Sequence, residues 1–205
     1  MAARVPNRST IECCMVSVAL TGLVIYTIGH SNRPLDEFLE ILQAHSIKRL
    51  ADIRSLPGSA KYPHFNSENL ADTLAGVGID YVWIEKLGGR RRKIKGFDSP
   101  NSDLYSPAFR NYADYMLGEE FIRGVSELIE IASASRTACM CAEALFWRCH
   151  RRLLSDYLSA HGIDVRHIFT ARNIRSHTMS RDAVVRRDGR VIYPAAAMAG
   201  RHKLE

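Results

Sequence analysis

The chain has 205 residues, of which 46% are hydrophobic and 24% charged, and it contains no internal repeat or low-complexity tract. This composition is typical of one globular domain with a full hydrophobic core, and it excludes the fibrous, disordered and disulfide-stapled classes. The formal net charge is +6, but residues 1–147 carry 16 basic against 17 acidic side chains, so the excess lies from Arg148 onward. A second basic run spans Arg90–Lys95. The distribution favours a phosphate-bearing partner, and the alternative is a solvated basic surface.

The N-terminal part of the chain combines cysteines with an apolar run. Cys13 and Cys14 are adjacent and the other three cysteines are clustered, which is a poor disulfide framework and indicates a reducing compartment. The run "CCMVSVALTGLVIYTIG" has no small-residue cleavage site and is shorter than the roughly 20 residues of a membrane span. We therefore predict a cytoplasmic protein without membrane association, in which residues 1–22 form a loose extension.

Apolar runs rich in β-branched residues alternate along the chain with segments of helical periodicity. The runs that predict buried strands span residues 23–29, 47–55, 79–85, 136–143 and 163–169. The segments that predict helices span residues 34–45, 67–79, 108–134 and 145–161. In the tail, a hairpin is predicted to turn at Asp188-Gly189.

The alternation predicts a three-layer α/β sandwich with a mostly parallel central sheet of about five strands, helices on both faces and a C-terminal hairpin. The α/β domain is expected over residues 23–171, followed by a basic tail over residues 172–205 that contains the hairpin. In such sheets, ligands bind beyond the carboxyl ends of the strands. The first four predicted strands end in "GHSNR", "DIRSLPGS", "EKLGGRRR" and "CAE", so we predict that these segments converge on one pocket.

Four polar residues lie at the carboxyl ends of the first two predicted strands. His30 and Ser31 precede a helix, where backbone amides and the helix dipole favour an anion; alternatively, Ser31 only caps the helix and His30 is a surface imidazole. Asp52 and Arg54 alternate along one strand and so share a face. They could form an ion pair that shapes a pocket, with Arg54 offered to a phosphate, or a purely structural salt bridge.

The polar segment from Lys86 to Pro107 is long for a compact domain and opens with Gly88, Gly89 and Arg90. Loops of this length are usually lids, binding loops or disordered segments. Its glycines, cations and aromatic residues predict a flexible flap over an anionic ligand, and a disordered basic loop is the alternative.

The segment "CMCAEALFWRCHRR" (Cys139–Arg152) allows three interpretations. Cys141, at a strand end before a helix, could be a thiolate nucleophile with Glu143 and His150 beside it. A zinc site built from Cys141, Cys149 and His150 would need a fourth ligand or a water, and its spacing matches no tight CxxC knuckle. The third interpretation is structural, with cysteines packed as small hydrophobic residues.

A helical wheel over residues 145–161 separates these candidates. It places Cys149 and His150 on the buried stripe of the helix, Arg148 and Arg152 on the outside, and Arg151 at the edge, within reach of the strand ends. We therefore expect Cys149, like Cys139, to pack in the core.

Five motifs in order resemble the domain of unknown function 488 family. They are "YTIGHSNRPLDEFLEIL", "ADIRSLPGSAKYPHF", "YVWIEKLGG", "FRNYADYM" and "CAEALFWRCHRRLLSDYL", and the resemblance covers residues 24–170. It implies a single α/β domain in a mostly prokaryotic, intracellular family, and it implies no reaction. The characteristic positions of the family fall here on Gly29, His30, Ser31, Asp52, Arg54, Pro57, Phe65, Leu87, Gly88, Gly89, Cys141, Glu143, Cys149, His150 and Arg151.

Together these features predict an enzyme, a hydrolase or transferase, that acts on a nucleotide, a nucleic acid or another phosphate-bearing substrate. The predicted catalytic side chains are His30, Asp52, Cys141, Glu143 and His150. The residues predicted to hold the anion are Ser31, Arg54, Gly88, Gly89, Arg90 and Arg151. No cofactor or metal is predicted. The alternatives are a non-catalytic module that binds nucleic acid or a nucleotide and, less favoured, a metal-dependent protein.

Overall fold

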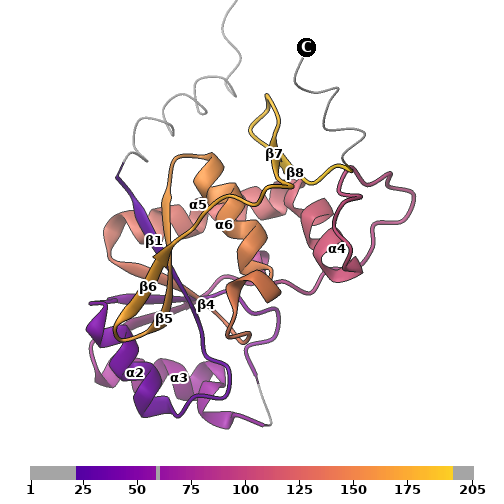
Figure 1. The fold of residues 1–205 in the computed structure, drawn as a ribbon. Coiled ribbons are helices and arrows are strands. Elements are labelled where there is room, and N and C mark those ends of the chain that lie inside the picture. The colour runs from indigo at the N-terminus through magenta and orange to yellow at the C-terminus, as the bar shows by residue number, and fades with distance from the viewer. Residues whose placement is uncertain (1–21, 59–60, 196–205) are drawn as a thin grey trace, which may run out of the picture.

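The computed structural model describes residues 22–58 and 61–195, and Figure 1 shows how their helices and strands are arranged. The strands are β1 Val24–Gly29, β2 Arg49–Asp52, β3 Asp80–Trp83, β4 Thr137–Cys141, β5 Asp164–Thr170, β6 Asn173–Ser176, β7 Val184–Val185 and β8 Val191–Ile192. The α-helices are α2 Leu35–Ala44, α3 Ser67–Gly76, α4 Pro107–Met116, α5 Glu119–Ala134 and α6 Arg151–Ala160. Short 3-10 turns span Pro63–Phe65, Glu85–Leu87 and Phe146–Arg148. The expected extension over residues 1–22 lies almost wholly outside the described residues.

Six strands form one sheet in the order β3-β2-β4-β1-β5-β6. The first five pair in parallel, and β6 runs antiparallel to β5. The predicted α/β class, the mostly parallel sheet and the C-terminal hairpin β7-β8 are confirmed. The turn of the hairpin contains Gly189 at φ +79°, a conformation that glycine adopts without steric cost. Strand β6 was not predicted, because all four of its residues are exposed and it carries no hydrophobic pattern.

Helices cover both faces of the sheet. In Figure 1, α2 and α3 lie on one side and α4, α5 and α6 on the other. Because successive strand residues point to opposite faces, β1 supplies Tyr26 and Ile28 to the core under α2 and α3, and Ile25 to the core under the other helices. Strand β4 divides in the same way, with Met140 on the first side and Cys139 and Cys141 on the second.

The chain direction creates a crevice between β1 and β4. From β1, the chain passes through α2 to β2 on one side of β4; from β4, it passes through α6 to β5 on the other side of β1. The two connections therefore leave neighbouring strands in opposite directions and on opposite faces of the sheet. Open α/β sheets bind their ligands at such a point, beyond the carboxyl ends of the strands.

Two predicted helices differ from the observed ones. The helix expected over residues 108–134 is interrupted at Leu117 and Gly118, so α4 and α5 are separate. The helix expected over residues 145–161 starts only at Arg151, because Cys149 has an extended backbone (φ −129°, ψ 153°) that ends the preceding 3-10 turn. The wheel that placed Cys149 on a helix stripe was therefore wrong, and Cys149 lies in the loop before α6.

The long segment between Lys86 and Pro107 is anchored at both ends. Near its start, the Arg91 guanidinium donates to the Glu85 and Lys86 carbonyls. Near its end, the fully buried Asn101 donates to Asp114 through its side-chain amide. Between these anchors, residues 92–98 are exposed.

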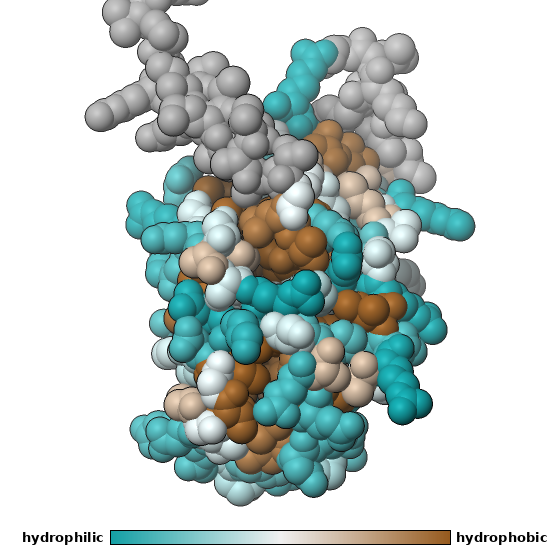
Figure 2. Space-filling view, turned by 90° about the vertical axis from the view of Figure 1, so that its left-hand side faces the viewer, coloured by the Kyte–Doolittle hydropathy of each residue, from teal (hydrophilic) through white to brown (hydrophobic). Residues whose placement is uncertain are grey.

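One face of the molecule is shown in Figure 2, where hydrophobic patches are separated by hydrophilic residues. Within residues 22–58 and 61–195, none of the helices combines the length and the apolar character that crossing a bilayer would require.

Candidate functional site

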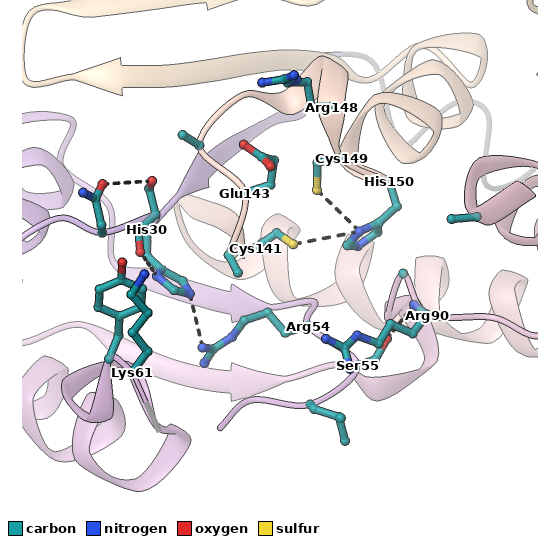
Figure 3. A pocket seen from close by; sticks show the side chains of 18 of the residues that line it. His30, Arg54, Ser55, Lys61, Arg90, Cys141, Glu143, Arg148, Cys149 and His150 are labelled. Atoms are coloured by element: carbon teal, nitrogen blue, oxygen red, sulfur yellow. Dashed lines mark hydrogen bonds between the residues drawn. The ribbon is translucent and has the colours of Figure 1, made fainter. Parts of the chain in front are cut away.

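A pocket of about 750 Å³ opens at the carboxyl ends of β1, β2 and β4. Its size lies within the range of small-molecule sites. Figure 3 shows its labelled side chains, with Cys141 between a histidine-arginine group on one side and a second histidine on the other. The lining residues with polar or sulfur-bearing side chains are His30, Ser31, Asn32, Arg54, Ser55, Lys61, Tyr62, Arg90, Cys141, Glu143, Arg148, Cys149 and His150.

The sulfur-bearing end of the pocket consists of Cys141, Cys149 and His150. The Nδ1 atom of His150 lies 3.9 Å from Sγ of Cys141 and 3.5 Å from Sγ of Cys149, and the three atoms lie within 4.8 Å of one another. Both sulfurs are buried, and the imidazole is partly buried. Nδ1 is therefore the ring nitrogen of His150 that faces both sulfurs.

Glycine allows the backbone to approach this group closely. A Cβ on Gly89 would lie 2.3 Å from Nδ1 of His150, and one on Gly29 would lie 2.0 Å from the Glu143 carbonyl oxygen. A side chain at position 89 would therefore displace the imidazole, and one at position 29 would displace the loop after β4. On another side, the ring of Tyr112 packs 5.0 Å from the imidazole of His150.

The two pocket cysteines titrate as a pair. The pKa of the Cys149 thiol lies well below its usual range, chiefly because the Cys141 thiol donates a hydrogen bond to its thiolate; His150 adds to this effect and burial opposes it. The pKa of Cys141 is raised for the reciprocal reason and by burial.

The opposite side of the pocket is built around His30 and Arg54. The Arg54 guanidinium donates to both carboxylate oxygens of Asp52, to the Phe65 carbonyl oxygen (2.8 Å) and toward Nε2 of His30 (3.4 Å). The imidazole of His30 stacks on the Phe65 ring with centroids 4.1 Å apart. Tyr81 also donates to Asp52, at 2.7 Å. The ion pair expected between Asp52 and Arg54 is thus present and fully buried.

His30 is neutral in this setting. Burial and then the neighbouring Arg54 charge lower its pKa from 6.5 to about 4. Its Nδ1 donates to the Ser31 carbonyl oxygen, so Nε2 is the acceptor that faces Arg54. The backbone amides of His30 and Ser31 donate to the carbonyls of Cys141 and Ala142, at 3.0 and 2.9 Å. The expectation that these amides point at a docked anion is therefore wrong, because they extend the pairing of β1 with β4.

Accessible positive charge lies at the rim of the pocket. Lys61, Arg90 and Arg148 are all exposed and line the opening. Neither Arg90 nor Arg148 forms an ion pair with another residue that the structure describes. Glu143 is also exposed in this wall, and it is the pocket's acidic side chain.

Arg151 has a different position from these rim cations. It is 1% exposed and donates to the carbonyl oxygens of Glu143 and Ala144, so it fixes the loop that follows β4. As the helical wheel predicted, the Arg151 guanidinium reaches the carboxyl end of β4. The groups that it binds there are backbone carbonyls.

The structure brings most of the predicted site residues into the pocket wall, namely His30, Ser31, Arg54, Gly89, Arg90, Cys141, Glu143 and His150. Outside the wall, Asp52 lies behind Arg54, Gly88 packs on Ser55, and Arg151 lies under the loop. Lys61, Arg148 and Cys149 also line the pocket, although the helical wheel had placed Arg148 on the outside and the favoured interpretation had packed Cys149 in the core. The family resemblance had included Cys149 among its characteristic positions, and this was the available signal.

The comparisons with known proteins gave one result. The family model described as "Domain of unknown function DUF488" matches residues 34–158, which include α2 to most of α6 and all of the pocket-lining residues except His30, Ser31 and Asn32. Neither the curated proteins nor the solved structures contained a match.

Proposed function

The chain belongs to the family described as domain of unknown function DUF488, and from that premise we propose that it is an enzyme acting on a phosphate-bearing substrate in the strand-end pocket. The rim cations would hold the phosphate, and the groups at the sulfur-bearing end would carry out the chemistry. A hydrolase or a transferase fits this arrangement.

One observation carries the proposal: cations with no ion-pair partner in the described chain and a sulfur-imidazole group line the same pocket. Arg90 and Arg148 present guanidinium forks, which match the geometry of phosphate oxygens. A structural salt-bridge network would satisfy such charges within the protein. Here their carboxylate neighbour in the pocket wall is Glu143, whose side chain accepts from the Leu145 amide at 3.3 Å.

The aromatic lining supports a nucleotide or a nucleic acid as the substrate class. Tyr62 and Phe109 line the pocket together with the rim cations, and Trp147, next to Arg148, is 45% exposed. Aromatic rings bind the flat faces of bases, while arginine and lysine bind the phosphates. The combination therefore favours a base-bearing phosphate over inorganic phosphate alone.

On the opposite side of the pocket, His30, Arg54 and Asp52 would hold neighbouring groups in position and would not exchange protons near neutral pH. His30 is neutral, and both of its ring nitrogens have partners. Arg54 is held by Asp52 and by the Phe65 carbonyl, so it can shape the wall while its charge is balanced. We assign Asp52, Arg54 and His30 to positioning, and Glu143 to proton transfer at the exposed wall. The buried thiols also suit a reducing compartment, which supports the cytoplasm as the location.

The second candidate is a module that binds nucleic acid without turnover. Its support is the exposed basic stretch beyond the pocket, in which Arg92, Lys93 and Lys95 precede Phe97, which is 39% exposed. A steep salt dependence of oligonucleotide binding without any chemical conversion would favour this module.

Binding is tested with mononucleotides and short oligonucleotides on the full chain. Removing two charge-assisted contacts, each contributing about 1.5–3 kcal/mol, should weaken binding by about 100-fold or more in an Arg90→Ala, Arg148→Ala double variant. The charge-matched control is Arg181→Ala with Arg187→Ala, because both residues are exposed and neither lines the pocket. Equal affinity of the two double variants would place the ligand outside the pocket and contradict the proposal.

A further inference from the structure

We propose that Cys141, Cys149 and His150 form a binding site for a thiophilic divalent cation of the zinc class, with one coordination position open to the pocket. This inference concerns the same pocket as the proposed function, but it stands on the ligand geometry and needs no substrate for its test. The sequence alone pointed away from it, because the ligands are few and their spacing matches no known knuckle.

The two nitrogen–sulfur distances agree with those around one tetrahedral metal ion. Zinc lies about 2.3 Å from a cysteine sulfur and about 2.0–2.1 Å from a histidine nitrogen. At tetrahedral angles, sulfur and nitrogen ligands are then about 3.6 Å apart, and two sulfurs about 3.8 Å apart. The observed Nδ1–Sγ distances are 3.5 Å to Cys149 and 3.9 Å to Cys141, and the whole set lies within 4.8 Å.

The fold holds each ligand in place before any ion arrives. Cys141 ends β4, whose backbone is fixed by pairing with β1 and by the amide of His30 on its carbonyl oxygen. The loop that carries Cys149 and His150 is fixed by Arg151, which binds the carbonyls of Glu143 and Ala144. Such rigidity lowers the entropy that metal binding must otherwise remove.

The orientation of the imidazole also fits a ligand. The Gly89 backbone and the Tyr112 ring confine the ring of His150, and Nδ1 is the nitrogen that faces the sulfurs. A histidine binds a metal ion through an unprotonated ring nitrogen. In this structure, Nδ1 of His150 already faces the sulfurs of Cys141 and Cys149. The other nitrogen, Nε2, is buried and has no hydrogen-bond partner among the described residues.

The type of ligand set defines both the metal and the type of site. Two sulfurs and one imidazole select zinc or a similarly soft ion over magnesium or calcium, which require oxygen ligands. Structural zinc sites are closed by four protein ligands, whereas catalytic sites combine three with a water or substrate. All three ligands line the pocket, and the described residues supply no further histidine, cysteine or carboxylate to the cluster. The open position therefore faces the space where the substrate is proposed to bind.

Glu143 lies in the same wall, two residues after the ligand Cys141. In zinc deaminases, a glutamate two residues after a zinc ligand is not itself a ligand and transfers protons to and from the metal-bound water. The local order of ligand and glutamate is the same here, although the remaining ligands differ in spacing. This order is consistent with a metal-assisted reaction at the sulfur-bearing end of the pocket.

The first test measures metal in the full chain without any substrate. Reduced protein, purified without chelator, is analysed for zinc by mass spectrometry and then titrated with Zn²⁺ and Co²⁺ after metal removal. We expect about one equivalent per chain, with thiolate-to-cobalt charge-transfer absorption for the cobalt form. Folded, reduced protein that neither retains nor takes up these ions would overturn the inference, as would mass-spectrometric detection of a Cys141–Cys149 disulfide in protein kept under reducing conditions.

Variants then locate the ion. Removing a residue that only hydrogen-bonds to a metal ligand weakens metal binding by about 10–100-fold. Loss of a ligand itself, in Cys149→Ala or His150→Gln, should therefore weaken metal binding by more than about 100-fold. Cys139→Ala is the matched control, because Cys139 is a buried cysteine in β4, like the ligand Cys141, but lies outside the metal-binding cluster. A second control, Cys13→Ala with Cys14→Ala, tests the cysteines outside the described residues. Equal metal content in the ligand and control variants would overturn the site, whereas a failure of nucleotide binding alone would leave it intact and refute only the proposed substrate.

Discussion

Replacing Asp52 by Asn should unfold the protein at a much lower denaturant concentration. The Asp52 carboxylate is fully buried and accepts hydrogen bonds from the Arg54 amide, the Arg54 guanidinium and the Tyr81 hydroxyl. An amide side chain keeps the shape but removes the charge and turns an NH₂ group toward one of these donors. Arg54, which is 5% exposed, would then be a buried cation without its counter-charge. Breaking a buried ion pair on one side costs about 3–5 kcal/mol.

Equilibrium urea unfolding at neutral pH measures this loss. With a slope of about 2 kcal/mol per molar urea, a 4 kcal/mol loss lowers the midpoint by about 2 M. Asp80→Asn is the matched control, because Asp80 of β3 pairs with Arg49 of β2, the strand that also carries Asp52, but the Asp80 side chain is 68% exposed. Exposed pairs contribute about 0–1 kcal/mol, so this control should hardly move the midpoint. Equal midpoints for the two variants would refute the view that the Asp52–Arg54 pair supports this side of the pocket.

Two further predictions concern the imidazoles. Gly89→Ala should weaken zinc binding by about 10–100-fold, because its Cβ would lie 2.3 Å from Nδ1 of His150 and displace this ligand. Gly58→Ala is the control, because its nearest neighbour lies at 3.9 Å, and it should leave zinc binding unchanged. Similar zinc affinities of the two variants in a competition titration would contradict this. Burial, followed by the charges of His177 and Arg151, lowers the pKa of His167 from 6.5 to about 3. The unfolded chain therefore takes up this proton first, and stability should fall as the pH falls from about 6.5 toward 3, by on the order of 3 kcal/mol at pH 4. A His167→Gln variant should lose less stability between pH 7 and pH 4 than the wild type, and an equal loss in chemical denaturation would show that another group is responsible.

The strand-end pocket was accessible to sequence reasoning because two simple rules determine it. Apolar runs rich in β-branched residues and helical patterns predicted the alternation of strands and helices, and parallel strands with helical connections bring their carboxyl ends to one edge. His30 and Cys141 are far apart in sequence, yet they follow neighbouring strands β1 and β4. The shared face of Asp52 and Arg54 followed from strand alternation alone. No knowledge of side-chain packing was needed for these steps.

The pocket residues lie on two faces of the sheet, and predicting the face of each residue would have required the register of the strands. Cys141 lies on the α4–α6 side of the sheet, whereas His30 packs on Phe65 on the α2–α3 side. Sequence patterns give the alternation within a strand, but which helix covers which face depends on the tertiary connections. The predicted catalytic set therefore combined residues that the structure places in two separate groups.

The role of Cys149 was missed for a local reason. The apolar periodicity after residue 145 continues smoothly into α6, and nothing in the sequence marks the 3-10 turn and extended Cys149 that precede the helix. Tertiary contacts hold this loop, above all those from the buried Arg151 to two backbone carbonyls. Such contacts override helix periodicity, and they turn both Cys149 and His150 toward Cys141.

The proposed function depends most directly on chemical conversion at the sulfur-bearing end of the pocket. The decisive measurement is mass-spectrometric detection of products from a panel of nucleotides and oligonucleotides, with wild-type protein and a Cys141→Ser, Glu143→Gln double variant. Since general acid-base groups contribute about 100- to 10,000-fold, we expect the variant to lose at least 100-fold of the wild-type turnover while Cys139→Ala keeps it. Unchanged turnover by the double variant, or binding without any conversion by the wild type, would contradict the account.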